Sequence, residues 1–473
     1  MSTALWSIDE LVSATGAQRD REASGTVSGV SIDSRSLAKG DLFVPLVAER
    51  DGHAFVSSAF AAGAACALVR ADYQRKPGDG VLLRVADTLD GLRGIGIAAR
   101  ARCEEARVVA VTGSVGKTGT KEMLRACLEA VAPGRAHGAI KSFNNHWGVP
   151  LTLARMPAGT THAVFEIGMN HAGEITPLTR MVRPGVAIIT TVEPVHIEFF
   201  DSLDGIAEAK AEILLGVPKG GVAVLNADNQ YIGFLSARAS DLGLRVTRFG
   251  RSAAADVRLL DANADPEGTT VRVAHGTREI AYRIGAPGAH YVQNSLAVVG
   301  ALDALGIDPA IAAEVLPSIQ APQGRGARET LALDSGGAIL LVDESYNANP
   351  ASMRAALAVL GSIPRQAHPR RIAVLGDMRE LGTNADQFHA ALWPAVDSSG
   401  ADLVFACGPH MRRLVDQVPP GRLGGWAASS VEIAPWVAAV LAAGDAVMIK
   451  GSLGTNMAPI VAAVRARASR GGA

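Results

Sequence analysis

The chain of 473 residues carries 45 Lys and Arg against 46 Asp and Glu, and 48% of its residues are hydrophobic. The formal net charge of −1 gives no reason to expect a general nucleic-acid binder, so any phosphate recognition must be local. No apolar run reaches the length of about 18 residues that a membrane span needs, and the first ten residues do not predict a secretory signal.

Residues 1–106 are predicted to form a small α/β domain, the first of about three that this length allows. Strand ends that run into loops are expected at Val30–Arg35 and Asp41–Leu46. An Ala-rich helix is expected at about Ser57–Gly63, and a strand follows at Ala67–Val69. A basic, polar stretch near residue 100 ends this part of the chain.

Residues 107–324 are predicted to form a central domain with a mostly parallel sheet. An apolar strand at Val108–Val111 precedes a Gly-rich loop and a helix from about Lys117 to Ala130. The same order of strand, loop and helix then repeats, which is typical of a sheet covered by helices. Further strands are predicted at Ala163–Ile167, Ala187–Thr191 and Val222–Leu225, with helices at about Ile175–Met181, Ile206–Leu215, His290–Leu305 and Ile311–Ile319. Alternating polar and apolar residues in Val257–Ile284 predict an antiparallel hairpin at one edge.

Residues 325–473 are predicted to form a second open α/β sheet of Rossmann-like order. A Gly/Gln/Pro-rich segment at 321–326 predicts a hinge before it. Strands are expected at Ile339–Val342, Ile372–Leu375, Leu403–Ala406 and Ala446–Ile449, each separated by a helical stretch. The four cysteines of the whole chain have no paired spacing, which favours reduced thiols in a cytoplasmic protein.

The sharpest local pattern is Thr-Gly-Ser-Val-Gly-Lys-Thr at residues 112–118, between a predicted strand and a predicted helix. Glycines let such a loop wrap backbone N–H groups around phosphate oxygens, and the helix N-terminus adds a favourable dipole. Lys117 would neutralise the β- and γ-phosphates of ATP, and the Thr118 hydroxyl can ligate Mg²⁺. The loop is a shortened P-loop, because Val111 stands where the general pattern has its first glycine. The predicted nucleotide-binding residues of this loop are Gly113, Ser114, Val115, Gly116, Lys117, Thr118 and Gly119.

Three further residues are candidates for binding Mg²⁺ beside this loop. Glu166 ends one predicted strand, His196 follows another, and Lys210 lies on the next helix. In open α/β sheets ligands gather at the carboxyl ends of the strands, where all three residues could face the loop. Each residue taken alone is also compatible with a solvated or packed structural role.

Other polar motifs allow both a functional and a structural interpretation. Asn144 and Asn145 could read the amides of a peptide-like substrate or could be turn residues. Asp343 and the segment Tyr346–Pro350 could contact a nucleotide or simply cap a helix. The segment Asp33–Arg35 could likewise be a capped turn.

Taken together and in order, these motifs resemble the Mur ligases, the ATP-dependent amide-forming enzymes of peptidoglycan synthesis. The resemblance covers nearly the whole chain. The motifs that carry it are Asp33-Ser34-Arg35, Gly40–Pro45, Asp51–Phe55, the Gly-Lys-Thr loop, Asn144-Asn145, Glu166, His196, Ala209–Glu212, Tyr346–Pro350, Leu375–Gly382 and Lys450–Ser452. The last three resemble the family member that joins D-alanyl-D-alanine to UDP-N-acetylmuramoyl-tripeptide. The chain departs from the family at Gly119, where Thr is common, and at Leu453, where Arg is common.

The resemblance implies a role for each matched residue. It implies that Ser34, Arg35, Asp51 and His53 belong to a nucleotide-sugar site, and that Asn144 and Asn145 contact substrate. It implies nucleotide contacts from Asn294, Arg325, Asp343, Tyr346 and Asn347. It also implies two Mg²⁺ ions, held by Thr118, Glu166, His196 and Lys210, with Lys210 carried as a carbamate. Lys117, His196 and Lys210 are the expected catalytic residues.

The expected product is the UDP-muramoyl-pentapeptide, formed through an acyl phosphate by a monomer that binds neither nucleic acid nor membrane. Three alternatives remain open at this point. Folylpolyglutamate synthase shares the phosphate loop and the carbamylated lysine but normally lacks the nucleotide-sugar motifs found here. A P-loop switch would hydrolyse nucleotide without making an amide. A degenerate paralogue would have lost activity at positions such as Gly119 and Leu453.

Overall fold

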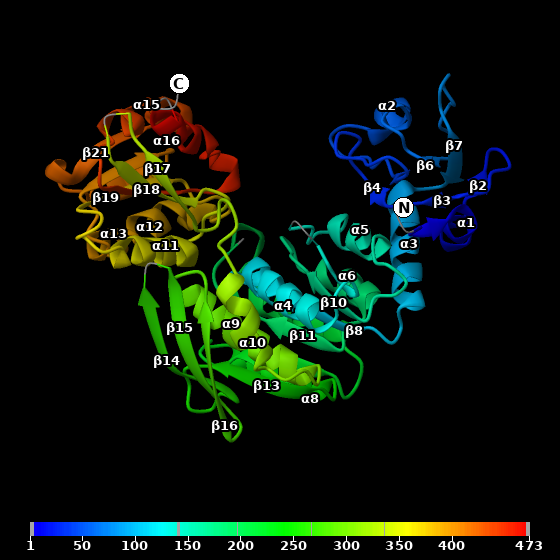
Figure 1. Cartoon of the computed structure of the whole chain (residues 1–473), viewed down its shortest axis with the longest axis horizontal. Coiled ribbons are helices and arrows are strands. Elements are labelled where there is room, and N and C mark those ends of the chain that lie inside the picture. The colour runs from blue at the N-terminus through cyan, green and yellow to red at the C-terminus, as the bar shows by residue number, and fades with distance from the viewer. Residues whose placement is uncertain (1–3, 140–141, 196, 266, 335, 470–473) are drawn as a thin grey trace.

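The computed structural model describes residues 4–139, 142–195, 197–265, 267–334 and 336–469. Three lobes follow one another along the chain, and each is built around its own sheet (Figure 1). The first lobe, in blue, and the third lobe, in yellow to red, stand apart above the green central lobe. The predicted α/β class with three units is therefore confirmed.

The first lobe contains a five-stranded sheet in the order β2-β7-β6-β5-β4, with a small antiparallel pair β1-β3 beside it. The sheet is parallel except for β2. The predicted helix near residue 57 and the strand near residue 67 are confirmed, whereas the helix α3 was missed. The strands are β1 Trp6–Ser7, β2 Gln18–Arg19, β3 Thr26–Val27, β4 Val30–Ser31, β5 Leu42–Phe43, β6 Cys66–Arg70 and β7 Val81–Val85; the helices are α1 Ile8–Thr15, α2 Val56–Ala61 and α3 Thr88–Arg102.

The central lobe contains a nine-stranded sheet in the order β16-β15-β14-β13-β12-β11-β8-β10-β9. The strands are β8 Arg107–Thr112, β9 Ala136–Gly138, β10 His162–Glu166, β11 Val186–Ile189, β12 Val222–Asn226, β13 Arg245–Gly250, β14 Val257–Asp265, β15 Gly268–His275 and β16 Arg278–Ile284. The helices are α4 Lys117–Val131, α5 Gly148–Ala154, α6 Ile175–Val182, α7 Leu203–Ala211, α8 Ile232–Asp241, α9 Ala289–Ala304 and α10 Ile311–Val315. The segment 257–284 is antiparallel as predicted, but it forms three strands instead of a two-stranded hairpin.

The third lobe contains a six-stranded sheet in the order β17-β18-β22-β19-β20-β21, parallel except for β17. The four predicted strands are confirmed as β18, β19, β20 and β22, and β17 and β21 are additional. The strands are β17 Ala327–Ala332, β18 Ala338–Glu344, β19 Arg370–Gly376, β20 Leu403–Cys407, β21 Leu423–Ala427 and β22 Asp445–Lys450; the helices are α11 Pro350–Ser362, α12 Ala385–Ala390, α13 Trp393–Ser398, α14 Arg412–Val415, α15 Ser430–Val440 and α16 Ala458–Ser469.

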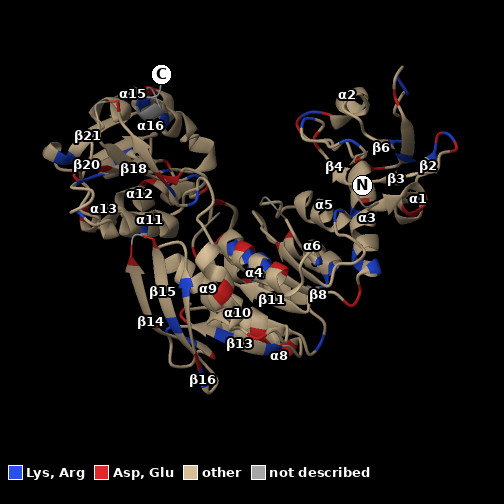
Figure 2. Ribbon diagram, in the orientation of Figure 1, with Lys and Arg blue, Asp and Glu red and all other residues tan. Residues whose placement is uncertain are grey.

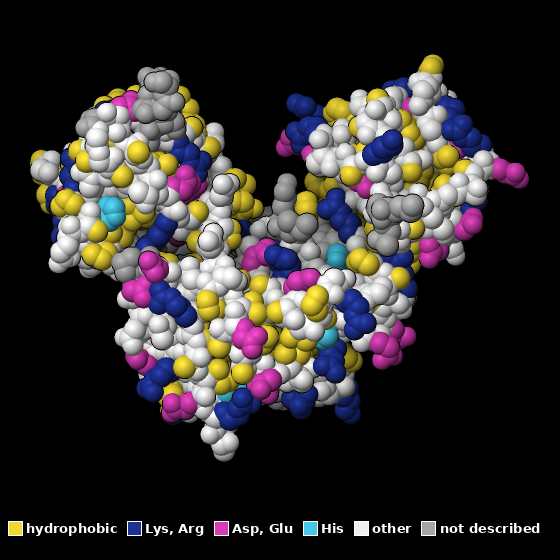
Figure 3. Space-filling model, in the orientation of Figure 1, with side chains coloured by type: hydrophobic (Ala, Val, Ile, Leu, Met, Phe, Trp, Pro, Cys, Tyr) yellow, Lys and Arg dark blue, Asp and Glu magenta, His cyan; other side chains and the backbone are white. Residues whose placement is uncertain are grey.

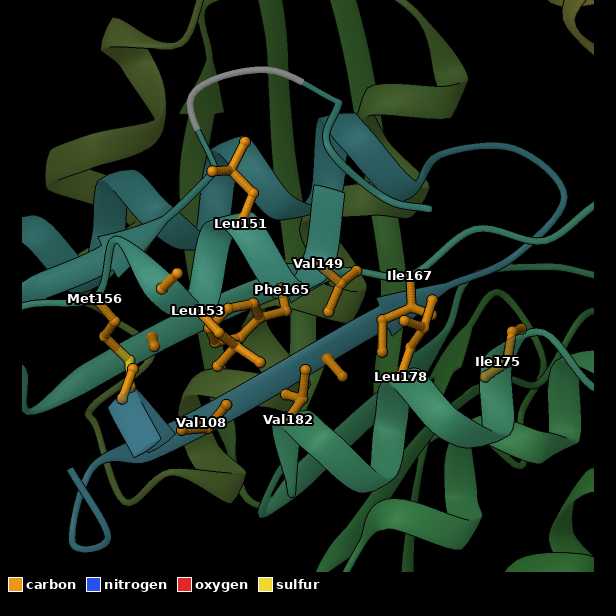
Figure 4. Close-up of a cluster of buried hydrophobic side chains, with 14 of the residues drawn as sticks. Val108, Val149, Leu151, Leu153, Met156, Phe165, Ile167, Ile175, Leu178 and Val182 are labelled. Carbon is orange, nitrogen blue, oxygen red and sulfur yellow. The ribbon is translucent and has the colours of Figure 1, made fainter. Parts of the chain in front are cut away.

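The hydrophobic cores do not follow the three lobes one to one. A single cluster runs from the first lobe, at Trp6, into the central lobe as far as Leu244. Figure 4 shows its central part, where aliphatic side chains of α5 and α6 pack on β8 and β10. The opposite face of the central sheet is covered by α4, α9 and α10 over a second cluster. The third lobe has separate clusters on the two faces of its own sheet.

Charged residues of both signs are interspersed over all three lobes (Figure 2). This agrees with the near-zero net charge. Within the described ranges, none of the helices combines the length and the hydropathy needed to cross a bilayer.

Candidate active site

A cavity of about 660 Å³ lies between the central and third lobes. Its walls come from the loops after β8, β10, β11, β18, β19 and β22, together with the start of α9. The carboxyl ends of the parallel strands in both sheets therefore face one another across the cavity, which is where open α/β sheets bind ligands. Figure 3 shows the molecule hollowed between its first and third lobes, above the central lobe.

The phosphate loop forms the central-lobe wall of this cavity, between β8 and α4. Gly113 has φ 146° and Gly116 has φ 86°, values that only glycine adopts readily. A Cβ atom on Gly113 would also collide with the hydroxyl of Thr190, which donates to the Val115 carbonyl at 2.5 Å. The loop is thus held close to the end of β11, with its backbone turned toward the cavity.

Lys117 opens α4 and its Nζ donates to the Gly113 carbonyl at 2.6 Å. Burial lowers the pKa of Lys117, and the nearby Glu166 carboxylate works in the opposite direction. A cation enclosed by a glycine-rich loop at a helix N-terminus suits the binding of a polyphosphate.

Thr118 and Glu166 provide oxygen ligands next to this lysine. The Thr118 hydroxyl donates to Glu166 Oε2 at 2.9 Å, and Asn144 Nδ2 donates to Glu166 Oε1 at 2.7 Å. Glu166 is 2% exposed, so Asn144 fixes one carboxylate oxygen and leaves the other beside the hydroxyl. One hydroxyl and one carboxylate fit Mg²⁺, which needs few protein oxygens when phosphates and water complete its octahedron. No group of three or more His, Cys, Asp or Glu side chains suited to a metal occurs among the residues that the structure describes.

Lys210 lies in the last turn of α7 and is only 3% exposed. Burial, and then the charge of Lys117, lower the pKa of Lys210 well below its ordinary value. This environment favours a neutral amine, the form that can react as a nucleophile. The predicted ligand His196 lies outside the described residues.

Asn294 lies on α9 and presses its carboxamide against the phosphate loop. A Cβ atom on Gly116 would lie 2.5 Å from Asn294 Oδ1, and one on Gly119 would lie 2.5 Å from Asn294 Nδ2. The departure from the family at Gly119 therefore has a physical reason in this chain, because a side chain there would displace Asn294.

The hinge residue Arg325 lines the cavity and bridges the two lobes. Its guanidinium stacks over the Tyr346 ring at 4.2 Å and donates to Ser142 Oγ at 3.2 Å. Tyr346, 39% exposed, and Asn347 also line the cavity. An exposed aromatic ring beside a guanidinium is suited to stacking on a nucleobase.

Two predicted residues lie near the cavity but outside its lining. The Asp343 carboxylate accepts from the Ser345 hydroxyl at 2.6 Å and pairs with Arg465 at 3.5 Å, so it stabilises the turn after β18. Asn145 Oδ1 accepts from Trp147 N at 3.2 Å and Gly148 N at 2.9 Å at the start of α5. Both side chains thus hold local turns, and the nucleotide contact of Asp343 and the substrate contact of Asn145 stay predictions.

The predicted sugar-site residues lie in the first lobe. His53 is buried; its Nδ1 lies 2.6 Å from Asp51 Oδ1, and its Nε2 accepts from the Arg70 backbone N–H at 3.1 Å. Both ring nitrogens are therefore occupied within the lobe. Arg35 is exposed and binds Asp33 through two guanidinium nitrogens, next to the half-buried Ser34.

Several cavity residues had no predicted role, although Lys450 and Arg379 lie in motifs that carry the resemblance. Lys450 Nζ lies 3.2 Å from Glu344 Oε2 and donates to the Asn347 carbonyl at 2.9 Å, and both charged residues are nearly buried. Thr190 and Arg379 also line the cavity. Glu344 and Lys450 are the last residues of β18 and β22, so the rule that ligands bind at strand ends could have found them.

Two stretches of the sequence match known protein families. Residues 111–302 match the Mur ligase middle domain, and residues 330–453 match the Mur ligase glutamate ligase domain. The chain belongs to the Mur ligase family.

Relatives within the Mur ligases are similar over most of their length. The UDP-N-acetylmuramoyl-tripeptide–D-alanyl-D-alanine ligase of Bacillus subtilis is 36% identical over 406 residues, 85% of this chain and 84% of that protein. The ligase of the same name from Rickettsia prowazekii is 31% identical over 436 residues, covering 91% and 94%. A crystal structure of MurF from Acinetobacter baumannii superposes with a TM-score of 0.83 at 28% identity, covering 98% of this chain and 99% of that one.

Proposed function

We propose that this chain joins D-alanyl-D-alanine to UDP-N-acetylmuramoyl-tripeptide at the expense of ATP, giving the UDP-muramoyl-pentapeptide, ADP and phosphate. The observation that carries the proposal is the interlobe cavity, in which the phosphate loop with Lys117 lies beside the Thr118–Glu166 pair. The names of the relatives, which are 31–36% identical over most of the chain, supply the substrates.

The chemistry requires that a carboxylate be activated, because its leaving group would otherwise be oxide. The terminal carboxylate of the tripeptide attacks the γ-phosphorus of ATP, the bond to ADP breaks, and an acyl phosphate forms. The amine of the dipeptide then attacks the carbonyl carbon, phosphate leaves with the bonding electrons, and the amine loses a proton. Positioning and charge neutralisation carry such phosphoryl transfers.

In this scheme the side chains of the central lobe hold the anionic groups in place. Lys117 binds the β- and γ-phosphates, and Asn144 orients Glu166 so that one carboxylate oxygen and the Thr118 hydroxyl can hold Mg²⁺. When bound, Mg²⁺ would neutralise phosphate charge. Asn294, Arg325 and Tyr346 contact the nucleoside.

The proposal includes a second Mg²⁺ site at His196 and a carbamate on Lys210. Support comes from the depressed pKa of the buried Lys210, because a neutral amine can take up CO₂ whereas an ammonium would repel a metal ion. Lys210→Ala is expected to lose activity that short carboxylic acids restore. Full activity without added acid would contradict the carbamate.

The remaining site assignments belong to the same proposal. The uridine-linked sugar lies on the first lobe near Ser34, Arg35, Asp51 and His53. The three domains comprise residues 1–106, 107–324 and 325–473. The enzyme acts as a cytoplasmic monomer, and the location is supported by its nucleotide-activated substrates and by four free, buried cysteines.

The test is an ATP-dependent coupling assay with purified UDP-muramoyl-tripeptide, in its lysine and diaminopimelate forms, and D-alanyl-D-alanine. Phosphate release should require both substrates and should equal pentapeptide formation. Release at the same rate without the dipeptide would instead indicate a nucleotide-hydrolysing switch.

A further inference from the structure

Arg379 occupies the third-lobe wall of the cavity, in the loop that follows β19. Its backbone N–H donates to Ser452 Oγ at 2.9 Å, and the Ser452 N–H donates to the Asp377 carbonyl at 3.1 Å. The loops after β19 and β22 are thereby fastened together. The position of the Arg379 backbone is therefore set by the fold and does not depend on a mobile surface turn.

The other Lys and Arg residues that line the cavity are already engaged. Lys450 is buried against Glu344, Arg325 stacks on Tyr346, and Lys117 lies on the phosphate loop. These contacts tie Lys117 to the phosphate loop, Arg325 to an aromatic ring and Lys450 to a carboxylate of the third lobe.

The Arg379 guanidinium, in contrast, has no acidic partner among the residues that the structure describes. The residue is exposed, and its side chain runs beside Gly454: a Cβ atom there would lie 3.7 Å from Arg379 Cγ and 3.8 Å from Nε. A guanidinium presents its donors in a planar fork that matches a carboxylate. Arg379 is thus placed to receive an anionic group that enters the cavity.

Small side chains line the cavity at the start of α11, where alanines lie next to Asn349 and Ser352. Ala348, Ala351 and Ala355 line the cavity at and within the start of α11, and Leu453, 67% exposed, lies in the loop beside Arg379. The alanine side chains are small enough to leave room for methyl groups.

We propose that Arg379 binds the terminal carboxylate of the incoming dipeptide, with the two alanyl methyl groups against the small side chains of α11. The amine end of the dipeptide then points across the cavity toward the phosphate loop. This inference rests on the proposed function, because it takes the amine substrate to be D-alanyl-D-alanine. Arg379 acts as a specificity residue: it distinguishes an acceptor with a free carboxylate from one without.

The test compares D-alanyl-D-alanine with its C-terminal amide, which lacks the negative charge. The wild-type enzyme should prefer the acid by about 10- to 100-fold in kcat/KM, the range expected for a charge-assisted hydrogen bond. Arg379→Met should remove most of this preference by raising the KM for the acid, while the KM values for ATP and the tripeptide stay unchanged. Arg379→Lys should keep part of the preference, because it keeps the charge but loses the fork.

The matched control is Arg412→Met, which removes an exposed arginine of the same lobe whose ion partner is Asp416. It should leave the preference unchanged. Equal loss of activity on acid and amide in Arg379→Met, or a preference retained in full, would overturn the proposal. If the wild-type enzyme couples neither dipeptide to the tripeptide, the proposed function itself has failed, so the two failures are distinguishable.

Discussion

The central lobe meets its two neighbours in different ways. Toward the first lobe it shares a continuous hydrophobic core, and Trp6 Nε1 donates to the Ala154 carbonyl at 2.8 Å. Arg102 stacks over the Trp6 ring at 3.5 Å and donates to the Met156 carbonyl at 2.6 Å, and Arg155 donates to the Val30 carbonyl at 2.7 Å. These bonds link side chains to buried backbone, so they fix the orientation of the first lobe.

Among the residues that the structure describes, fewer such contacts join the central lobe to the third lobe. Glu198 N lies 3.4 Å from the Glu380 carbonyl, Arg325 reaches Ser142, and Ile197 packs against clusters of both lobes. The space between them is the cavity that carries the proposed chemistry. The first and central lobes thus form one packed unit, whereas the third lobe is joined to it through the segment 321–326 and lies across the cavity.

The largest effect is expected from Lys117→Met, in the cavity between the central and third lobes. Loss of the cation that is proposed to bind the β- and γ-phosphates should lower kcat/KM about 10³-fold or more. The melting temperature should change little, because the hydrogen bonds that the Lys117 side chain makes among the described residues go to carbonyls of its own loop. Activity assays measure kcat/KM, and calorimetry measures the melting temperature. Lys219→Met, at an exposed turn, is the control for charge removal.

Trp6→Ala tests the junction between the first and central lobes. It should lower stability strongly and leave ATP binding nearly unchanged. Removing a side chain that is 3% exposed should lower the free energy of unfolding by about 3–5 kcal/mol. The KM for ATP should remain close to wild type in the folded protein, because the cavity lies at the other junction. Urea unfolding measures the change. Trp436→Ala, at a site 47% exposed on α15, should cost far less; equal losses would show that the shared core contributes little.

Mild acid should lower the free energy of unfolding through His137. This residue lies on β9, and its Nε2 lies 2.7 Å from the Thr152 carbonyl of α5. Burial, with a contribution from Arg155, lowers the pKa of His137 to about 4. Between an ordinary pKa of about 6.5 and that value the unfolded chain binds a proton that the folded chain does not, so stability falls as pH falls. The loss should be about 2 kcal/mol.

Unfolding free energies at pH 7 and pH 4.5 measure this loss. His137→Gln should show a smaller difference between the two pH values. His146→Gln, at an exposed site, should keep the wild-type difference. If His137→Gln lost as much unfolding free energy between the two pH values as the wild type, other groups would cause the acid sensitivity.

The smallest effect is expected at Gly119, where the phosphate loop borders the cavity between the central and third lobes. A methyl group there would push the Asn294 carboxamide away, so Gly119→Ala should raise the KM for ATP about 5- to 20-fold, as expected for modest overpacking. Steady-state kinetics with varied ATP measure it. Gly233→Ala, on α8 with no atom near its Cβ position, should leave the KM unchanged. An unchanged KM in Gly119→Ala would show that Asn294 adjusts freely.

The sequence predicted those parts of the fold in which the local residue pattern matches the burial of the element in the structure. The phosphate loop, α4 and the buried parallel strands are of this kind. The helix α3 was missed because Gly91, Gly94 and Gly96 interrupt its pattern. The structure explains them: Cβ atoms there would lie 2.6 Å from Leu68 Cδ2, 2.5 Å from the Ala14 carbonyl and 3.1 Å from the Pro150 carbonyl.

The candidate site shows the same division. Residues adjacent in sequence to the phosphate loop could be found, because their backbone geometry follows from the motif. Asp343 was assigned to the nucleotide, but its neighbour Glu344 lines the cavity, since side chains alternate along β18. Pairs such as Glu344 with Lys450 depend on strand order, which spacing along the chain does not reveal.

The glycines of α3 also limit how the enzyme can be re-engineered. Because this helix of the first lobe packs closely against α5 of the central lobe, the first lobe is not an exchangeable module. A chimaera that borrows this lobe from a relative will need the facing surface of α5 from the same donor. The third lobe, joined through a short hinge, is the more tractable unit to transplant.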